Sequence, residues 1–225
     1  MSKIGFILSI CLLFLIGCSS SENKALYQDA IVSASDVQSL PSYPLIALTP
    51  DNPQVEWKDG KVALVTWHNR PDIYKGVFKS RPFVVWTVGF KELKDKLKTQ
   101  KECSVKRLEQ LFGLPPDTSY EYLSVVWVSP SSLWRPAYNV AVNTDNVSLT
   151  FDANASLTYI SWFKVQERKS YDMVFGRPWT RKGYTYDWGQ GDSHYGLSEY
   201  VIRQGALVEV KETLEVDDFL DKYCP

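Results

Sequence analysis

Two uninterrupted apolar runs, Phe83–Val88 (FVVWTV) and Tyr122–Val128 (YLSVVWV), constrain the fold of this chain more than any other feature. Both runs are rich in β-branched and aromatic residues, which are enriched in strands. A strand with apolar side chains on both faces is covered on both sides. Each run therefore predicts a central strand of a sheet that other elements cover.

Helical periodicity supplies elements that can cover such a sheet. Phe90, Leu93 and Leu97 are spaced at i, i+3 and i+7, which predicts a helix that begins near residue 90. A second helix is predicted at 105–112, with Ser104 as its N-cap and Gly113 at its end. Similar stripes predict helices at about 154–169 and 215–223.

The remaining strands are predicted from turn residues. Asp59-Gly60 lies between β-forming segments and predicts a hairpin over 55–67. Gly205 separates two predicted strands, 199–202 and 206–212, and a short strand is predicted at 147–151. Strands mixed with three to four helices, without a regular β-α-β alternation, indicate a single α+β domain with a mixed or antiparallel sheet.

Prolines mark the start of this domain. Pro41, Pro44, Pro50 and Pro53 disfavour helices and central strands in the segment before residue 55. We expect residues 18–54 to form a lipid-anchored tether and a loop-rich lead-in. Residues 55–225 are then expected to form the α+β globular domain.

The amino terminus carries an export signal. Lys3 precedes an apolar run, Ile4–Ile16, that is shorter than the roughly 20 residues of a membrane span. The following Leu15-Ile16-Gly17-Cys18 resembles the lipobox of bacterial lipoprotein signal peptides. That resemblance implies a signal peptide at 1–17, cleavage before Cys18 and acylation of Cys18, which anchors the protein in a membrane. The alternative is an uncleaved signal anchor.

The resemblance also bears on location and partners. Ser19 follows the lipidated position, and it is not the Asp that resembles an inner-membrane retention signal. We therefore expect a cell-envelope lipoprotein, in the outer membrane if the host is Gram-negative. The charges of the chain nearly balance, with 25 Lys and Arg against 26 Asp and Glu, so nothing drives the protein toward nucleic acid.

Two cysteines remain after processing, Cys103 and Cys224. In an oxidising envelope we expect them to form a disulfide, with two free thiols as the alternative. The chain has no CxxC motif and no cluster of Cys and His, so we expect neither a metal site nor a cofactor.

The densest group of aromatic residues falls in GYTYDWG. Tyr184, Tyr186 and Trp188 are spaced two apart, so a strand would place them on one face. Three such rings, with Trp179 as a neighbouring wall, predict either a platform for a flat ligand or a stripe of the core.

Catalytic candidates lie beside these rings. Glu199, His194 and Asp187 are the candidates for an acid–base group, because carboxylates and histidine move protons in hydrolases. A surface loop is the alternative setting for His194, and His68 is expected to be structural.

Two further resemblances concern the mature chain. SEYVIRQGALVEV, residues 198–210, resembles the closing strands of ADP-ribosyltransferases, although Tyr200 intervenes and no Ser-Thr-Ser strand is evident. It implies Glu199 as the catalytic glutamate, a strand serine that assists it, and Arg81 or Arg135 as the residue that binds NAD. The segments RPAYN (135–139), PWTRKGYTYDWG (178–189) and GLSEYVI (196–202) resemble motifs of uncharacterised bacterial proteins. This second resemblance covers roughly residues 83–213 and implies no activity.

Three functions follow as expectations. The leading one is a non-enzymatic lipoprotein that presents an aromatic surface to a glycan, a peptide or an envelope protein. The second is an envelope enzyme, either a glycan hydrolase or an ADP-ribosyltransferase-like protein, that uses Glu199 with His194 or Asp187. The third is a structural or assembly lipoprotein.

Overall fold

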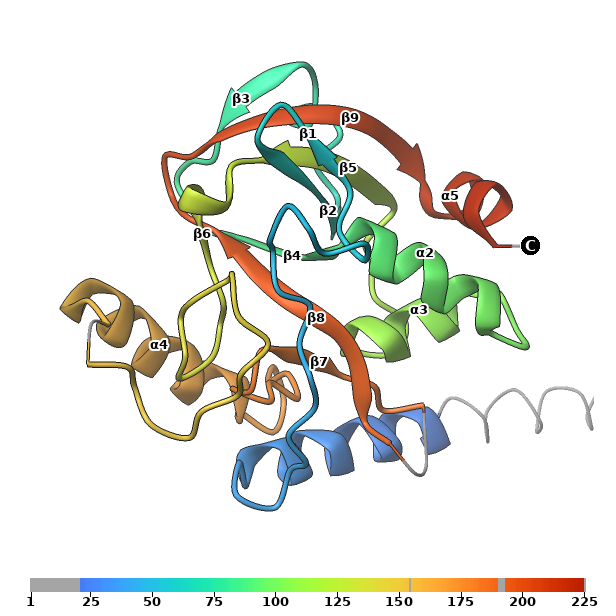
Figure 1. The fold of residues 1–225 in the computed structure, drawn as a ribbon. Coiled ribbons are helices and arrows are strands. Elements are labelled where there is room, and N and C mark those ends of the chain that lie inside the picture. The colour runs from blue at the N-terminus through green and yellow to red at the C-terminus, as the bar shows by residue number, and fades with distance from the viewer. Residues whose placement is uncertain (1–20, 154, 190–192, 225) are drawn as a thin grey trace, which may run out of the picture.

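Nine antiparallel strands form one sheet in the computed structural model, which describes residues 21–153, 155–189 and 193–224 (Figure 1). The strand order is β3-β9-β5-β2-β4-β8-β6, with β1 paired to β2 and β7 paired to β8. The predicted α+β class is thereby confirmed, with an antiparallel sheet. The strands are β1 (Trp57–Lys58), β2 (Lys61–His68), β3 (Val77–Lys79), β4 (Val85–Gly89), β5 (Tyr122–Val128), β6 (Leu133–Trp134), β7 (Tyr184–Tyr186), β8 (Tyr195–Ile202) and β9 (Leu207–Glu215).

Helices cover one face of this sheet. Helices α2 (Phe90–Thr99), α3 (Val105–Phe112) and α5 (Val216–Tyr223) lie together on the right in Figure 1. They pack on the face of β2 and β5 that carries Val65, Leu123 and Val125. The opposite face carries Leu64, Val126 and Tyr200, and segments without regular structure cover it, Leu48 among them.

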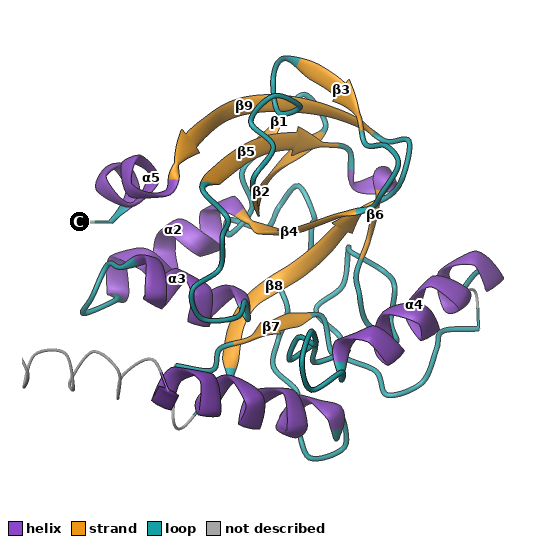
Figure 2. Ribbon diagram, turned by 180° about the vertical axis from the view of Figure 1, so that it is seen from behind, coloured by secondary structure: helices purple, strands orange, loops and turns teal. Residues whose placement is uncertain are grey.

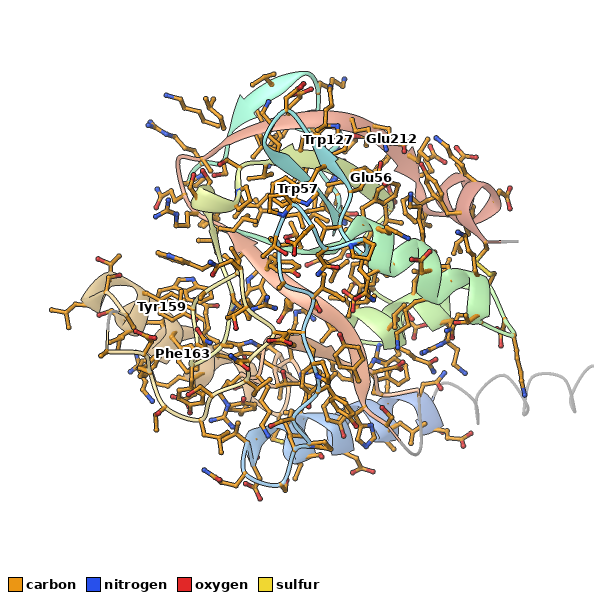
Figure 3. The ribbon with its side chains drawn as sticks, viewed as in Figure 1. Glu56, Trp57, Trp127, Tyr159, Phe163 and Glu212 are labelled. Carbon is orange, nitrogen blue, oxygen red and sulfur yellow. A yellow bond between two sulfur atoms is a disulfide. The ribbon has the colours of Figure 1, made fainter. Side chains whose placement is uncertain are left out.

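Helix α4 (Leu157–Ser170) packs away from these three helices (Figure 2). Its Ser156 N-cap accepts a hydrogen bond from the Tyr159 backbone N–H. Tyr159 and Phe163 project from one side of the helix and form a cluster of aromatic side chains with Trp179 (Figure 3). Tyr159 Oη bonds the backbone of Ala137, which attaches the helix to the loop that follows β6.

The sheet opens between β2 and β4. Strands β2 and β5 pair at seven positions from Val62 to His68, whereas β2 and β4 pair only at Leu64↔Gly89 and Val65↔Val88. Beyond Val65 the two strands diverge, so the ends Thr66–His68 and Val85–Thr87 face a gap instead of each other. This divergence positions the candidate site described below.

Several local predictions are confirmed. The hairpin turns at Asp59 and Gly60, which both have positive φ. Ser104 Oγ caps α3 by accepting from the Arg107 backbone N–H, and Gly113 ends the helix in the left-handed region at φ 64°. The predicted disulfide is present between Cys103 and Cys224, with a Cα–Cα distance of 6.1 Å, and it joins the start of α3 to the end of α5.

Two predictions of secondary structure are wrong, and two short strands, β3 and β6, were not predicted. Residues 147–151 form no strand. Residues 21–35 form a helix instead of a loop-rich lead-in. The prolines that argued against helix all lie after residue 40, whereas Tyr27, Ile31 and Ala34 form a buried stripe at helical spacing.

This first helix is packed against the rest of the fold. Its buried residues cluster with Tyr186 and Trp188, and Figure 1 shows it beneath β7 and β8. Residues 36–56 then run without helix or strand along the sheet, as the four prolines predicted. In the part of the chain that the structure describes, no helix has the length and apolarity needed to cross a membrane. The predictions for residues 1–20, including acylation of Cys18, lie outside the described residues.

Candidate functional site

The predicted aromatic stripe is part of the core. Trp179, Tyr184, Tyr186 and Trp188 expose 5%, 0%, 2% and 4% of their surface, so these rings form no exposed platform. Tyr184 and Tyr186 do share one face of β7, as their spacing predicts, but residues 27–43 cover that face. The physical reason is burial: large aromatic rings contribute most when removed from water, and the first helix supplies the cover.

Hydrogen bonds from the ring atoms tie these side chains into the fold, although Trp179, Tyr184 and Tyr186 also line the pocket described below. Tyr184 Oη donates to the Pro41 carbonyl at 2.9 Å, and Trp188 Nε1 donates to the Leu114 carbonyl at 2.9 Å. Trp179 Nε1 donates to the Pro136 carbonyl at 3.2 Å. These three polar ring atoms are therefore satisfied by the backbone of distant segments, and Tyr186 Oη is satisfied by Ser33 Oγ.

Two of the three catalytic candidates are also committed to the fold. The Asp187 carboxylate pairs with the Arg107 guanidinium of α3, with Oδ1 to Nη1 at 2.7 Å, and it accepts from the Gly189 N–H. The His194 ring stacks on Tyr186 with 4.4 Å between ring centroids, and its Nδ1 lies 3.2 Å from the Asp187 carbonyl. The predicted pairing of Glu199 with either residue is not found.

Glu199 instead lines a pocket where β2 and β4 diverge. This β2/β4 pocket has a volume of about 630 Å³. The diverging ends of β2 and β4 form its floor, and the end of α4, β7 and the loops at 80–84 and 175–179 contribute its walls. Its volume is in the range of pockets that hold small molecules and cofactors. Neither Asp187 nor His194 is among its described lining residues.

The Glu199 carboxyl group is unusual among the described side chains of this site. Glu199 is partly buried as a residue, but its Oε2 atom is buried and has no hydrogen-bond partner among the described residues. Because the register places Glu199 opposite Val88, its near neighbour on the sheet is apolar. Burial raises the pKa of Glu199 from 4.5 to about 8, so this carboxyl group is mainly protonated at neutral pH.

His68 is the other titratable group near the floor of the pocket. Its Nδ1 accepts from the Arg70 backbone N–H at 2.9 Å, so its Nε2 carries the proton and donates to Ser124 Oγ at 2.8 Å. The ring also stacks on Tyr74 with centroids 3.8 Å apart. Burial lowers the pKa of His68 to about 4. A neutral imidazole with both nitrogens engaged supports the strand end instead of donating a proton to a ligand.

The other charged side chains of the pocket are cationic. Arg70, Arg81, Lys169 and Arg177 are exposed residues among the described lining. Arg70 is paired with Asp72 at 3.0 Å, whereas no described residue forms an ion pair with Arg81, Lys169 or Arg177. The pocket thus combines one deep carboxyl group with exposed positive charge.

The structure separates the two arginines that the ADP-ribosyltransferase resemblance implied. Arg81 lines the same pocket as Glu199. Arg135 is fully buried, and its guanidinium donates to the carbonyls of Ile46, Ala141, Val142 and Thr144. Only Arg81 is therefore placed to meet a ligand beside Glu199.

Sequence reasoning missed Trp86 as a site residue. This tryptophan lies in the apolar run FVVWTV, is only partly buried, and lines the pocket with its ring 5.9 Å from that of Trp179. The run carries no local signal of a cavity, because the gap arises from how β2 and β4 diverge.

Searches against protein-family models, curated proteins and solved structures find no match for this chain.

Proposed function

We propose that this protein is an envelope lipoprotein that binds a nicotinamide dinucleotide in the β2/β4 pocket and cleaves its N-glycosidic bond, as ADP-ribosyltransferases do. The observation that carries this proposal is Glu199, a carboxyl group with an unpartnered buried oxygen in a pocket whose other charges are cationic. The resemblance of residues 198–210 supports it, because that resemblance assigns the catalytic role to the same glutamate.

The walls of the pocket suit such a substrate. The nicotinamide ring is a flat cation, which aromatic faces such as Trp86 attract. The pyrophosphate carries negative charge, and Arg81, Lys169 and Arg177 are cations of the described lining that form no ion pair with a described residue. The substrate then spans the pocket from Glu199 to the exposed cations.

The chemistry follows from the charge of Glu199. The bond between nicotinamide N1 and ribose C1′ breaks, and its electron pair stays on the nitrogen, which leaves a neutral nicotinamide. Positive charge develops on the ribose, and an ionised carboxylate beside it stabilises that charge. The acceptor oxygen, from water in the simplest case, bonds to C1′ and releases its proton to solvent.

Binding and ionisation are linked in this scheme. The bound nicotinamide cation lowers the pKa of Glu199 from about 8, so binding at pH 7 releases a proton from the carboxyl group. Cleavage needs the ionised form. Its rate therefore rises as the pH increases from 6 to 8.

Release of nicotinamide from NAD tests the proposal. We expect Glu199→Gln to retain NAD binding but to slow cleavage by at least about 100-fold, the loss typical for removal of one stabilising group. His194→Gln is the matched control: His194 lies outside the described lining, so its substitution should leave cleavage unchanged. If calorimetry detects no binding of NAD by the wild-type protein, the proposal is refuted.

Binding without catalysis is the second candidate, and one observation favours it. The described lining offers no second carboxyl group, and both His68 nitrogens are engaged in hydrogen bonds. The protein would then capture a small ligand in the pocket and not cleave it. NAD binding with no nicotinamide release at any pH from 6 to 9 would favour this function over the first.

The membrane anchor is part of the same proposal. It rests on the resemblance of Leu15-Ile16-Gly17-Cys18 to a lipobox. Acyl chains on Cys18 would hold the protein at the envelope membrane. Mass spectrometry of the mature amino terminus tests this, and an unmodified Cys18 in a chain that still begins at Met1 would contradict it.

A further inference from the structure

Exposed apolar side chains stand at the mouth of the β2/β4 pocket. Phe83 exposes 76% of its surface, Val174 78% and Phe175 85%, and Met173 beside them exposes 51%. Phe83 and Phe175 both line the pocket, from the 80–84 loop and the 175–179 loop. We call Phe83 together with Met173–Phe175 the mouth surface.

The mouth surface is held in shape by its own turn. Asp172 Oδ1 accepts from the backbone N–H groups of Val174 and Phe175 at 2.9 and 2.8 Å, and Gly176 N donates to the Asp172 carbonyl. Arg177 N then donates to the Ser170 carbonyl at 2.7 Å, which closes the turn onto the end of α4. The apolar tip is therefore presented by an ordered turn, and exposed apolar groups of this kind mark interaction sites.

We infer that the mouth surface docks an acidic protein segment, whose apolar side chains cover Phe83 and Val174 and whose carboxylates meet Lys169 and Arg177. The inference rests on the proposed function, since this segment is then the acceptor that receives the group bound at Glu199. Charge complementarity carries the choice of partner: the exposed charged residues of the described lining are cationic.

Two other partners fit the mouth surface less well. An anionic bilayer is flat and would have to cover Asp172 as well, an exposed residue at the tip whose carboxylate is charged because backbone hydrogen bonds lower its pKa. A peptide segment seated on Phe83 and Val174 can instead leave Asp172 in water. Nucleic acid would stack its bases on aromatic rings along a basic track, whereas Met173 and Val174 are not aromatic and the whole chain has a net charge of -1.

Binding of defined polymers tests the inference. A random Glu/Tyr copolymer should bind the wild-type protein, whereas a Lys/Tyr copolymer should not. Val174→Ser and Lys169→Gln should each weaken binding of the Glu/Tyr copolymer by at least about fivefold, as loss of a central contact does. Leu157→Ser is the matched control, because Leu157 is 82% exposed but lies outside the pocket lining, and it should have no effect.

Equal binding of the two copolymers would overturn the inference. So would a loss of Glu/Tyr copolymer binding in Leu157→Ser as large as that in Val174→Ser. Stronger binding to phosphatidylglycerol vesicles or to oligo-dT than to the Glu/Tyr copolymer would also overturn it. Nicotinamide release from NAD by Val174→Ser separates this inference from the proposed function. Release at the wild-type rate with weakened copolymer binding supports both. In the wild-type protein, release without any copolymer binding refutes the docking alone, and copolymer binding without release refutes the proposed function alone.

Discussion

At the scale of the residue, Glu199 illustrates how a carboxyl group is perturbed by what surrounds it. Its Oε2 has no partner, whereas the buried Glu92 carboxylate accepts from Tyr195 Oη at 2.8 Å and from the Ser198 N–H at 2.9 Å. Glu92 thus serves the fold by joining α2 to β8. Glu199 has no such task, and a buried group without a structural task is a candidate for a functional one.

The first prediction concerns how the stability of the protein, measured without added ligand, depends on pH. In the folded state the pKa of Glu199 is about 8, against 4.5 in the unfolded chain, so unfolding releases a proton between these values. Stability therefore falls as the pH rises from about 4.5 to about 8, by roughly 2–4 kcal/mol. Glu199→Gln has no carboxyl group at this position, so the variant does not lose this stability. The free energy of unfolding of the variant minus that of wild type should therefore be roughly 2–4 kcal/mol larger at pH 8 than at pH 5.

Urea unfolding at the two pH values measures this difference. Glu209→Gln is the control, since Lys61 and Lys58 hold the pKa of Glu209 below its usual value and the residue stays ionised throughout this range. If the difference in free energy of unfolding between Glu199→Gln and wild type were the same at pH 5 and pH 8, the raised pKa of Glu199 would be contradicted.

At the scale of the element, strand β7 is held between α3 and the first helix. Thr185 Oγ1 donates to the Leu111 carbonyl of α3 and accepts from the Leu197 N–H. On the other face, Tyr186 Oη bonds Ser33 Oγ of the first helix at 3.1 Å. Gly196 permits this packing, because a Cβ there would lie 2.2 Å from Thr185 Oγ1.

The second prediction tests whether the aromatic stripe is core. Trp188 packs edge-on against Tyr27 of the first helix with centroids 5.9 Å apart, so Trp188→Ala should lower the free energy of unfolding by about 3–5 kcal/mol. The exposed Phe175 is the control, and Phe175→Ala should change it by less than about 0.5 kcal/mol. Weaker ligand binding by Trp188→Ala at unchanged stability would restore the platform hypothesis.

Most elements were predictable because their signals are local. The cap at Ser104, the left-handed Gly113 and the turn at Asp59-Gly60 each act within a few residues. The site was not predictable in the same way. Tyr184 and Tyr186 have the spacing of a one-sided strand, but the sequence alone does not say that a helix from 21–35 covers that side. Likewise the pocket depends on the loss of pairing after Val65, which is a long-range property of the sheet.

At the scale of the whole molecule, the disulfide closes the carboxyl-terminal half of the chain. Cys103 and Cys224 are 121 residues apart in sequence, and the loop between them contains most of the sheet and three of the helices that the structure describes. Phe219 and Leu220 of α5 join the core cluster beneath α2 and α3, so the bond reinforces a packed contact.

The third prediction follows from this closure. On the chain-entropy model a disulfide across a loop of this length stabilises by about 4–5 kcal/mol. The double variant Cys103→Ser, Cys224→Ser should therefore unfold roughly 10 °C below wild type in a thermal scan. Reductant should lower the midpoint of the wild-type protein and leave that of the variant unchanged. A variant as stable as wild type would show that α5 needs no covalent support.

The docked first helix has a practical consequence for recombinant production. A truncated protein that starts at residue 36 or 55 would lack the helix that covers Tyr186 and Trp188. It would also leave Arg181 without the Ala34 and Ser35 carbonyls, and a start at residue 55 would leave Lys182 without the Leu40 carbonyl. Newly bare aromatic surface promotes aggregation. The expressed chain should therefore begin at or before residue 21. If shorter versions are insoluble, the cause would be the loss of the first helix and not a failure of the remaining domain to fold.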